Sequence, residues 1–238
     1  MTAARNSSDG WSQRTPYLRS QILYRAAEMA QQRQFELAEE IARSTGIPPT
    51  QAQTEVNCCI ERLVHYAGWA DKYAAIFSST NPVASSHFSF TIPEPSGVVA
   101  IIAPDQPSLL ALVSLISAVI LSGNTAIVLV SEKYPLPALT FAEVFATSDI
   151  PPGVVNLLSG KRLELAPHFA SHLDINAIVD ASSDPSTSAL LRTGQSSNLK
   201  RYIHREMTDA DWYSEKAENP YWILDTIEYK TAWHPIGV

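Results

Sequence analysis

Glycine is scarce in this sequence. The 238 residues include only 9 glycines, and the two that lie closest together, Gly153 and Gly160, are seven positions apart. The motifs G-x-G-x-x-G and G-x-x-x-x-G-K-[ST] need glycines at shorter spacings, so neither can be present. The sequence therefore excludes the usual glycine-rich loops that hold nucleotide phosphates.

Cysteine is even rarer. The two cysteines, Cys58 and Cys59, are adjacent, and neighbouring residues on a helix do not face each other. No C-x-x-C pair occurs, so we predict no structural disulfide and no cysteine-based metal or redox motif. His168 and His172 have the i,i+4 spacing of metal ligands, but no third ligand accompanies them, and the sequence predicts no metal site.

Long apolar runs and basic clusters are missing too. The longest apolar stretch, 109–121, has about 13 residues and contains two serines, whereas a membrane-spanning helix needs about 20. Lys and Arg number 17 against 24 Asp and Glu, which gives a net charge of −7 and disfavours nucleic-acid and anionic-membrane partners. Residues 1–16 hold no apolar leader. We therefore expect a cytoplasmic protein with neither a membrane nor a nucleic acid as partner.

The first third of the chain has a helical pattern. A hydrophobic content of 45% is that of an ordinary globular protein. Residues 1–15 are polar and predict a flexible lead-in. Apolar positions three and four apart then predict one helix from Pro16 to the Gly46 region and a second, long helix that ends near Phe77.

Apolar strands alternate with helices from Gly97 onward. Segments 98–103 and 126–130 are continuously apolar and flank an apolar helix at 108–121. A strand, a helix and a strand without polar alternation predict a βαβ unit in a sheet that is covered on both faces. The alternation continues, so we predict an α/β fold with a doubly wound parallel sheet, Rossmann-like, as one domain at residues 16–204. Further helices are expected at 135–148, 161–171 and 185–194, and further strands at 154–158, 175–179 and 199–204.

The last part of the chain is less regular. Residues 205–220 are polar and predict a linker, whereas alternation over 227–233 predicts a strand, and 87–92 predicts an edge strand. The tail at 221–238 is rich in aromatic residues, which either form a docking surface or pack back on their own domain. Because the predicted sheet lies before the linker, a chain truncated after Asn219 is expected to fold.

A series of different short motifs lies between residues 94 and 201. They read Glu94-Pro95-Ser96-Gly97-Val98-Val99, Ile102-Ala103-Pro104, Gly123-Asn124-Thr125, Ser131-Glu132, Pro135-Leu136, Pro151-Pro152-Gly153-Val154-Val155-Asn156, Gly160, and Ser197-Asn198-Leu199-Lys200-Arg201. In this order they resemble the N-terminal, cofactor-binding domain of aldehyde dehydrogenases, and the resemblance covers about residues 14–204. It implies the same Rossmann-like fold with N-terminal helices. This family binds NAD(P) without a glycine-rich fingerprint.

The chain departs from that family at the turn after the first apolar strand. The family turn reads P-W-N-F-P, and its Asn amide donates to the oxyanion, a contribution of about 2.7–4 kcal/mol in comparable sites. Here the turn reads Pro104-Asp105-Gln106-Pro107. Gln106 stands in place of the oxyanion Asn, and Asp105 adds a carboxylate where negative charge would develop.

The cofactor motifs are altered as well. The family's K-P-S-E loop, whose Lys and Glu hold the ribose, reads Leu129-Val130-Ser131-Glu132, and its pyrophosphate turn F-T-G-S reads Asp180-Ala181-Ser182-Ser183. Asp180 is therefore expected to face the phosphates and repel them. The resemblance leaves Glu132, Ser183 and Gly160 as vestigial cofactor-binding residues and implies either no NAD(P) binding or weak NAD(P) binding.

The family's catalytic domain, with its nucleophilic Cys and general-base Glu, has no counterpart, since no Cys follows Cys59. The tail at 221–238 resembles the family's oligomerisation strand, and the layout resembles the second, degenerate unit of the sixteenth aldehyde dehydrogenase family. We expect a non-catalytic pairing or regulatory subunit that forms a homo-oligomer, or a complex with a full-length aldehyde dehydrogenase, through its C-terminal strand. Two alternatives stay open: an NAD(P)-dependent aldehyde oxidoreductase component completed by a partner, and a nucleotide-sensing module.

Overall fold

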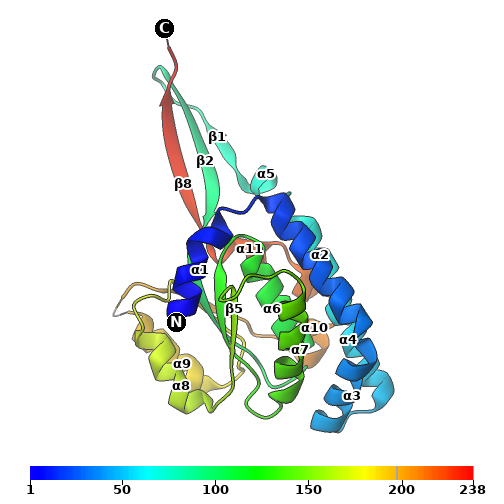
Figure 1. Cartoon of the computed structure of the whole chain (residues 1–238). Coiled ribbons are helices and arrows are strands. Elements are labelled where there is room, and N and C mark those ends of the chain that lie inside the picture. Colours follow the sequence, from blue (N-terminus) through cyan, green and yellow to red (C-terminus); the bar gives the residue numbers. More distant parts are fainter. Residues whose placement is uncertain (197, 238) are drawn as a thin grey trace.

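A five-stranded parallel sheet forms the centre of the molecule (Figure 1). The computed structural model describes residues 1–196 and 198–237, so Ser197 of the last motif and Val238 of the tail lie outside the described residues. The sheet order β5-β4-β3-β6-β7 confirms the predicted doubly wound fold. The strands are β3 (Val98–Ile102), β4 (Thr125–Leu129), β5 (Val155–Leu158), β6 (Ala177–Asp180) and β7 (Arg201–His204).

Helices cover both faces of this sheet. Alternate side chains of the central strands join two separate apolar clusters, because successive residues of a strand point to opposite faces. One face is covered by α6 (Leu110–Ile120) and α7 (Leu136–Thr147), with α2 (Pro16–Gln32), α3 (Gln34–Thr45) and α4 (Pro49–Trp69) packed outside them, and the other face is covered by α8 (Arg162–Ser171) and α9 (Pro185–Gln195).

Residues 1–15 are not the flexible lead-in that their polarity predicted. They contain helix α1 (Thr2–Ser12), and Trp11 within it is only 1% exposed. The Trp11 indole Nε1 donates to a carbonyl at the end of α6 at 2.8 Å, and the Arg19 guanidinium donates to the next one at 2.8 Å. Trp11 therefore anchors residues 1–15, and Trp11 and Arg19 together cap the buried C-terminal end of α6. These contacts order a segment whose polar composition predicted flexibility.

The helix predicted from Pro16 to the Gly46 region is two helices. α2 ends at Gln32 and α3 begins at Gln34, because the ψ of 13° at Arg33 between them leaves the helical range. The long second helix divides in the same way into α4 and the short α5 (Tyr73–Phe77).

Residues 205–220 form a packed connection rather than an open linker. They contain α10 (Asp209–Trp212) and the 3-10 helix η1 (Glu215–Glu218), and α11 (Tyr221–Leu224) follows. Trp212 is 1% exposed, and its carbonyl accepts from the buried Arg62 of α4 at 3.0 Å. The Tyr66 hydroxyl, also on α4, donates to the carbonyl of Ala217 at 3.1 Å. These buried contacts fix the connection to the N-terminal helices.

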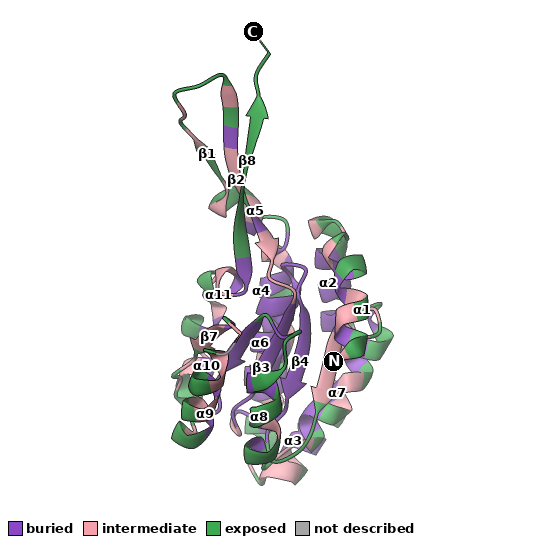
Figure 2. Ribbon diagram, turned by 90° about the vertical axis from the view of Figure 1, so that its left-hand side faces the viewer, coloured by how far each residue is buried: buried purple, intermediate pink, exposed green. Residues whose placement is uncertain are grey.

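A three-stranded antiparallel arm projects from the domain (Figure 2). It consists of β1 (Ser79–Asn81), β2 (His87–Pro95) and β8 (Ile227–Pro235) in the order β1-β2-β8. Strands at 87–92 and 227–233 are thus confirmed, and they pair with each other along their whole length. The prediction that 87–92 is an edge strand is wrong, because β2 lies between β1 and β8 and pairs with both. Within the described residues, β8 is the edge strand of the arm.

The aromatic residues near the C-terminus form a buried group and an exposed group. Trp212 and Trp222 are buried and pack edge to face, with ring centroids 5.8 Å apart. Tyr229 and Trp233 of β8 are 51% and 59% exposed. Trp222 of the tail therefore packs back on the domain, whereas Tyr221 beside it is 62% exposed, and β8 presents aromatic side chains to the outside. None of the described helices has the length and apolarity that a membrane crossing requires.

Candidate functional site

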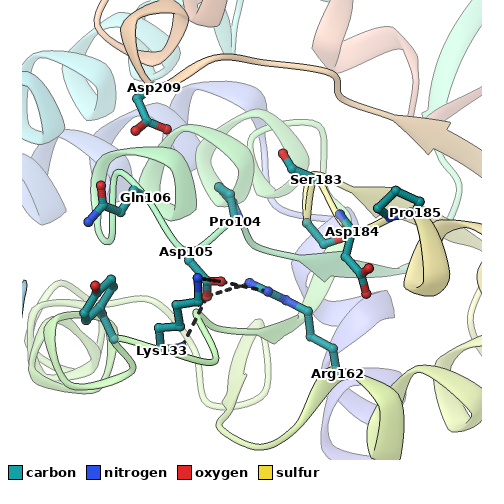
Figure 3. A pocket seen from close by; sticks show the side chains of 11 residues that line it. Pro104, Asp105, Gln106, Lys133, Arg162, Ser183, Asp184, Pro185 and Asp209 are labelled. Atoms are coloured by element: carbon teal, nitrogen blue, oxygen red, sulfur yellow. Dashed lines mark hydrogen bonds and ion pairs between the residues drawn. The ribbon is translucent and has the colours of Figure 1, made fainter.

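A crevice lies where the carboxyl ends of β3 and β6 separate. The chain leaves β3 toward β4 on one side, whereas β6 lies on the other side, and open α/β sheets bind ligands at such a switch point. A cavity of about 640 Å³ opens there (Figure 3). Its walls are residues 104–106 after β3, residues 133–134 after β4, Arg162, residues 182–185 after β6, and Asp209.

The Asp105 carboxylate ties three of these segments together. Its Oδ1 accepts from the Ser131 hydroxyl at 2.9 Å and from the backbone N–H groups of Glu132 and Lys133 at 3.0 and 3.2 Å. The Arg162 guanidinium donates to both carboxylate oxygens, at 2.8 Å to Oδ1 and 2.9 Å to Oδ2 (Figure 3). The sequence placed a free negative charge here, but the structure neutralises that charge with a bidentate arginine.

Arg162 is held as tightly as its partner. It is the first residue of α8, its side chain is 9% exposed, and its Nη2 also donates to the carbonyl of Ala103 at 3.0 Å. Its backbone N–H donates to the Glu132 carboxylate at 2.8 Å. Burial alone would raise the pKa of Asp105, but the hydrogen bonds from Arg162 and Ser131 outweigh it and lower the pKa below its usual 3.8.

A second carboxylate occupies the N-terminus of α9. Asp184 is the N-cap residue, and its side chain accepts from the backbone N–H groups of Ser186 and Thr187 at 3.2 and 3.1 Å. The hydrogen bond from the Thr187 hydroxyl is the main reason why the pKa of Asp184 is lowered. The first N–H donors of this helix, which could otherwise hold an anion, are therefore satisfied by the chain itself.

Asp180 does not face the cavity, so the expectation that it would repel cofactor phosphates there is wrong. It is fully buried at the end of β6, on the face covered by α9. Its carboxylate accepts from the hydroxyls of Ser182, Ser188 and Tyr202 at 2.7, 2.5 and 2.7 Å. Burial is the main cause that raises the pKa of Tyr202 to about 12, so this phenol stays protonated as a donor.

The structure separates the other residues selected from the sequence. Gln106 and Ser183 line the cavity from opposite sides, whereas Gly160 lies outside it. A Cβ at Gly160 would come within 2.8 Å of the end of the half-buried Leu165 side chain, which can shift, so packing does not require glycine there. Leu129, which replaces the family's Lys, is fully buried in the core. The roles of Gln106, Glu132, Ser183 and Gly160 toward a cofactor remain predictions.

Two residues of the site were missed by sequence reasoning. Asp184 carried a readable signal, because Asp followed by Pro185 is a typical N-cap and first-turn pair. Arg162 carried no such signal. It meets Asp105 only because β3, β4 and β5 lie side by side in the sheet, which brings the segments after these strands together. In the part of the chain that the structure describes, no cluster of three or more His, Cys, Asp or Glu side chains could hold a metal ion.

Relatives of known identity match most of the chain. The profile of the group described as the aldehyde dehydrogenase family matches residues 1–206. Omega-crystallin of Enteroctopus dofleini is 32% identical over 191 residues, which cover 80% of this chain and 38% of that protein. Aldehyde dehydrogenase family 2 member B4, mitochondrial, of Arabidopsis thaliana is 32% identical over 201 residues, 83% of this chain and 37% of that protein.

Solved structures agree with these sequence matches. PnpE in complex with nicotinamide adenine dinucleotide superimposes with a TM-score of 0.81 at 27% identity and covers 85% of this chain and 41% of that chain. The NAD-dependent aldehyde dehydrogenase from Sinorhizobium meliloti gives a TM-score of 0.80 at 25% identity, with 85% and 40% coverage. The chain spans about two fifths of the length of these relatives. It belongs to the aldehyde dehydrogenase family and comprises the N-terminal, Rossmann-like part of that fold.

Proposed function

We propose that this chain is a non-catalytic subunit of the aldehyde dehydrogenase type, which serves for pairing or regulation. The observation that carries this proposal is that the chain's own carboxylates occupy the donors of the ligand crevice. Asp105 engages Arg162, and Asp184 engages the N-terminus of α9. A dinucleotide phosphate at this helix end would have to displace a carboxylate of like charge.

The residues that remain do not fit a dinucleotide. One oxygen of the Glu132 carboxylate already accepts from the backbone N–H of Arg162, which leaves mainly the other oxygen for a ribose hydroxyl. Leu129 can donate no hydrogen bond. The chain also passes from β7 to β8 through the short helices of residues 205–226, so the thiolate that thiohemiacetal formation needs has no source in this part of the chain.

The arm supports the pairing role. Eight of the nine residues of β8 are exposed, and within the described residues its outer edge pairs with no other strand. An exposed edge of backbone N–H and C=O groups binds another strand by β-augmentation. We propose that β8 pairs with a second copy of this chain or with a full-length aldehyde dehydrogenase.

We predict that the purified chain oxidises no aldehyde with NAD or NADP. Cys59 is fully buried, and burial raises its pKa well above the usual 9.0, so it is not a reactive thiolate. Absorbance of the reduced cofactor, measured with aliphatic and aromatic aldehydes, checks the prediction. A matched Cys58→Ser/Cys59→Ser variant is the control. Turnover that the wild type shows and this variant lacks would refute the proposal.

We also predict that NAD binds weakly or not at all, and that Asp184→Ser binds it better than the wild type. Serine keeps an N-cap acceptor and removes the negative charge from the N-terminus of α9. Removing one charge repulsion, or gaining one hydrogen bond to a phosphate, should raise the affinity for NAD roughly tenfold to hundredfold. Calorimetry on both proteins measures it.

The alternatives keep one observation in their favour. The cavity stays open beside Gln106, Lys133 and Ser183, so a cofactor half-site or a nucleotide sensor has space. Calorimetric titration with NAD, repeated in the presence of a full-length aldehyde dehydrogenase, separates them from our proposal. Tight binding that needs the partner would favour the shared active site, and tight binding without the partner would favour the sensor.

A further inference from the structure

The donors around Asp105 come from segments other than its own. Ser131, Glu132 and Lys133 lie in the loop after β4, and Arg162 begins α8. Together they supply one hydroxyl, two successive backbone N–H groups and a guanidinium to two carboxylate oxygens. If the Asp105 side chain were removed, every one of these donors would remain in the chain.

This donor set has the chemistry of an oxyanion site. Successive backbone N–H groups that point at one atom form a concave anion-binding nest. A guanidinium fork matches carboxylate or phosphate oxygens in a bidentate manner. A second cation stands close by, because the Lys133 ammonium is 3.9 Å from Oδ2 and its side chain is 69% exposed toward solvent.

The donor set is also anchored without Asp105. Arg162 is fixed by the carbonyl of Ala103 and by the Glu132 carboxylate on its backbone N–H. The Ser131 hydroxyl accepts from the backbone N–H of Tyr134 at 2.9 Å, which fixes its oxygen. The site is therefore held in place by contacts that do not involve its present occupant.

We propose that Asp105 is an internal pseudo-ligand, whose carboxylate occupies a formed oxyanion site of residues 131–133 and Arg162. The site takes a free carboxylate or a phosphate once that side chain is absent. Asp184 and Asp209 line the opposite part of the cavity, so a small anion suits it better than a polyphosphate. This inference does not rest on the proposed function, because it concerns a small anion and not aldehyde chemistry or assembly.

Chemical rescue of Asp105→Ala tests the proposal. Thermal unfolding is followed for the variant and the wild type in sodium chloride, acetate and phosphate at equal ionic strength. We expect acetate or phosphate to raise the midpoint of the variant by about 3–6 °C over chloride at tenfold the dissociation constant. The wild type should show only the general stabilising effect of these anions, since its site is filled, and the rise in the variant is counted above that of the wild type. Comparison of acetate with phosphate identifies which oxyanion the site prefers.

Two variants serve as controls. Asp209→Ala removes an exposed acid from the same cavity without touching the donor set and should respond to the anions no more than the wild type does. Asp105→Ala/Arg162→Met should lose the rescue. Equal rescue of the wild type or of Asp209→Ala, or no rescue of Asp105→Ala, would overturn the proposal. If Asp105→Ala is unfolded in chloride, its recovery in acetate or phosphate supports the proposal, and failure to recover in either overturns it.

Discussion

A chain truncated after Asn219 is expected to unfold. The truncation deletes Trp222, Ile223 and Ile227, which are 7%, 0% and 2% exposed. Loss of one large buried apolar side chain costs about 2–5 kcal/mol, so three such losses are comparable with the whole stability of a domain, about 5–15 kcal/mol. The structure thus reverses the sequence-based expectation that this truncation leaves a folded domain.

A shorter truncation provides the matched control. Truncation after Glu228 keeps these three side chains and also the Thr226 carbonyl, which accepts from Asn124 at 2.7 Å, and removes only exposed residues of β8. We expect circular dichroism and tryptophan fluorescence to show this protein folded and the Asn219 truncation unfolded. A cooperative unfolding transition in the Asn219 truncation would contradict the expectation.

The same pair of proteins tests assembly. If β8 pairs with another subunit, light scattering should show the full chain as an oligomer and the Glu228 truncation as a monomer. A full chain that stays monomeric at high concentration would remove the main support for self-pairing through β8. It would leave pairing with a full-length aldehyde dehydrogenase, which mixing of the two proteins on a sizing column would then decide.

The centre of the parallel sheet was predictable because strands β3, β4 and β6 are fully buried. Strands β3 and β4 read as continuous apolar runs, since helices cover both faces of the sheet. All five residues of each strand are buried. Burial and local periodicity can be read from the sequence without knowledge of tertiary contacts. For this reason the βαβ units were predicted with nearly the observed bounds.

The polar segments were mispredicted because a few anchors order them. Segment 1–15 depends on Trp11, and segment 205–220 depends on Trp212 and Ala217. One buried tryptophan hardly changes the mean polarity of a segment, so composition does not reveal it. The partners of these anchors also lie far away in the sequence. The Trp11 indole reaches a carbonyl 109 residues away, and Arg62 reaches Trp212 across 150 residues.

In the candidate site, too, one part was predictable from the sequence and another part was not. The turn at residues 104–107 and the ends of β4 and β6 were placed correctly, because parallel strands bring their carboxyl ends to one edge. What each carboxylate does there was not predictable. Asp180 shares the face of Ile178 and points into the core, whereas Asp105 is neutralised by an arginine 57 residues away.

The second large effect concerns Glu55, which caps the buried helix α6. Glu55 is 2% exposed, and its carboxylate accepts from the backbone N–H groups of Leu109 and Leu110 at 2.7 and 3.2 Å. An unsatisfied buried donor costs about 1–3 kcal/mol, so Glu55→Ala should lower the free energy of unfolding by about 2–6 kcal/mol. Glu55→Gln keeps an acceptor oxygen and should lose much less. Urea unfolding, followed by tryptophan fluorescence, measures both.

Glu55 also gives the stability a definite pH dependence. Burial raises its pKa above the usual 4.5, and the hydrogen bonds from Leu109 and Leu110 offset only part of that rise. The folded state therefore holds this proton to higher pH than the unfolded chain. The resulting contribution is complete below about pH 4.5 and is lost as pH rises through the folded pKa. The stability of the wild type relative to Glu55→Gln should consequently fall as pH rises above 4.5. A difference that instead grows with pH would show that the helix N-terminus dominates over burial and lowers this pKa.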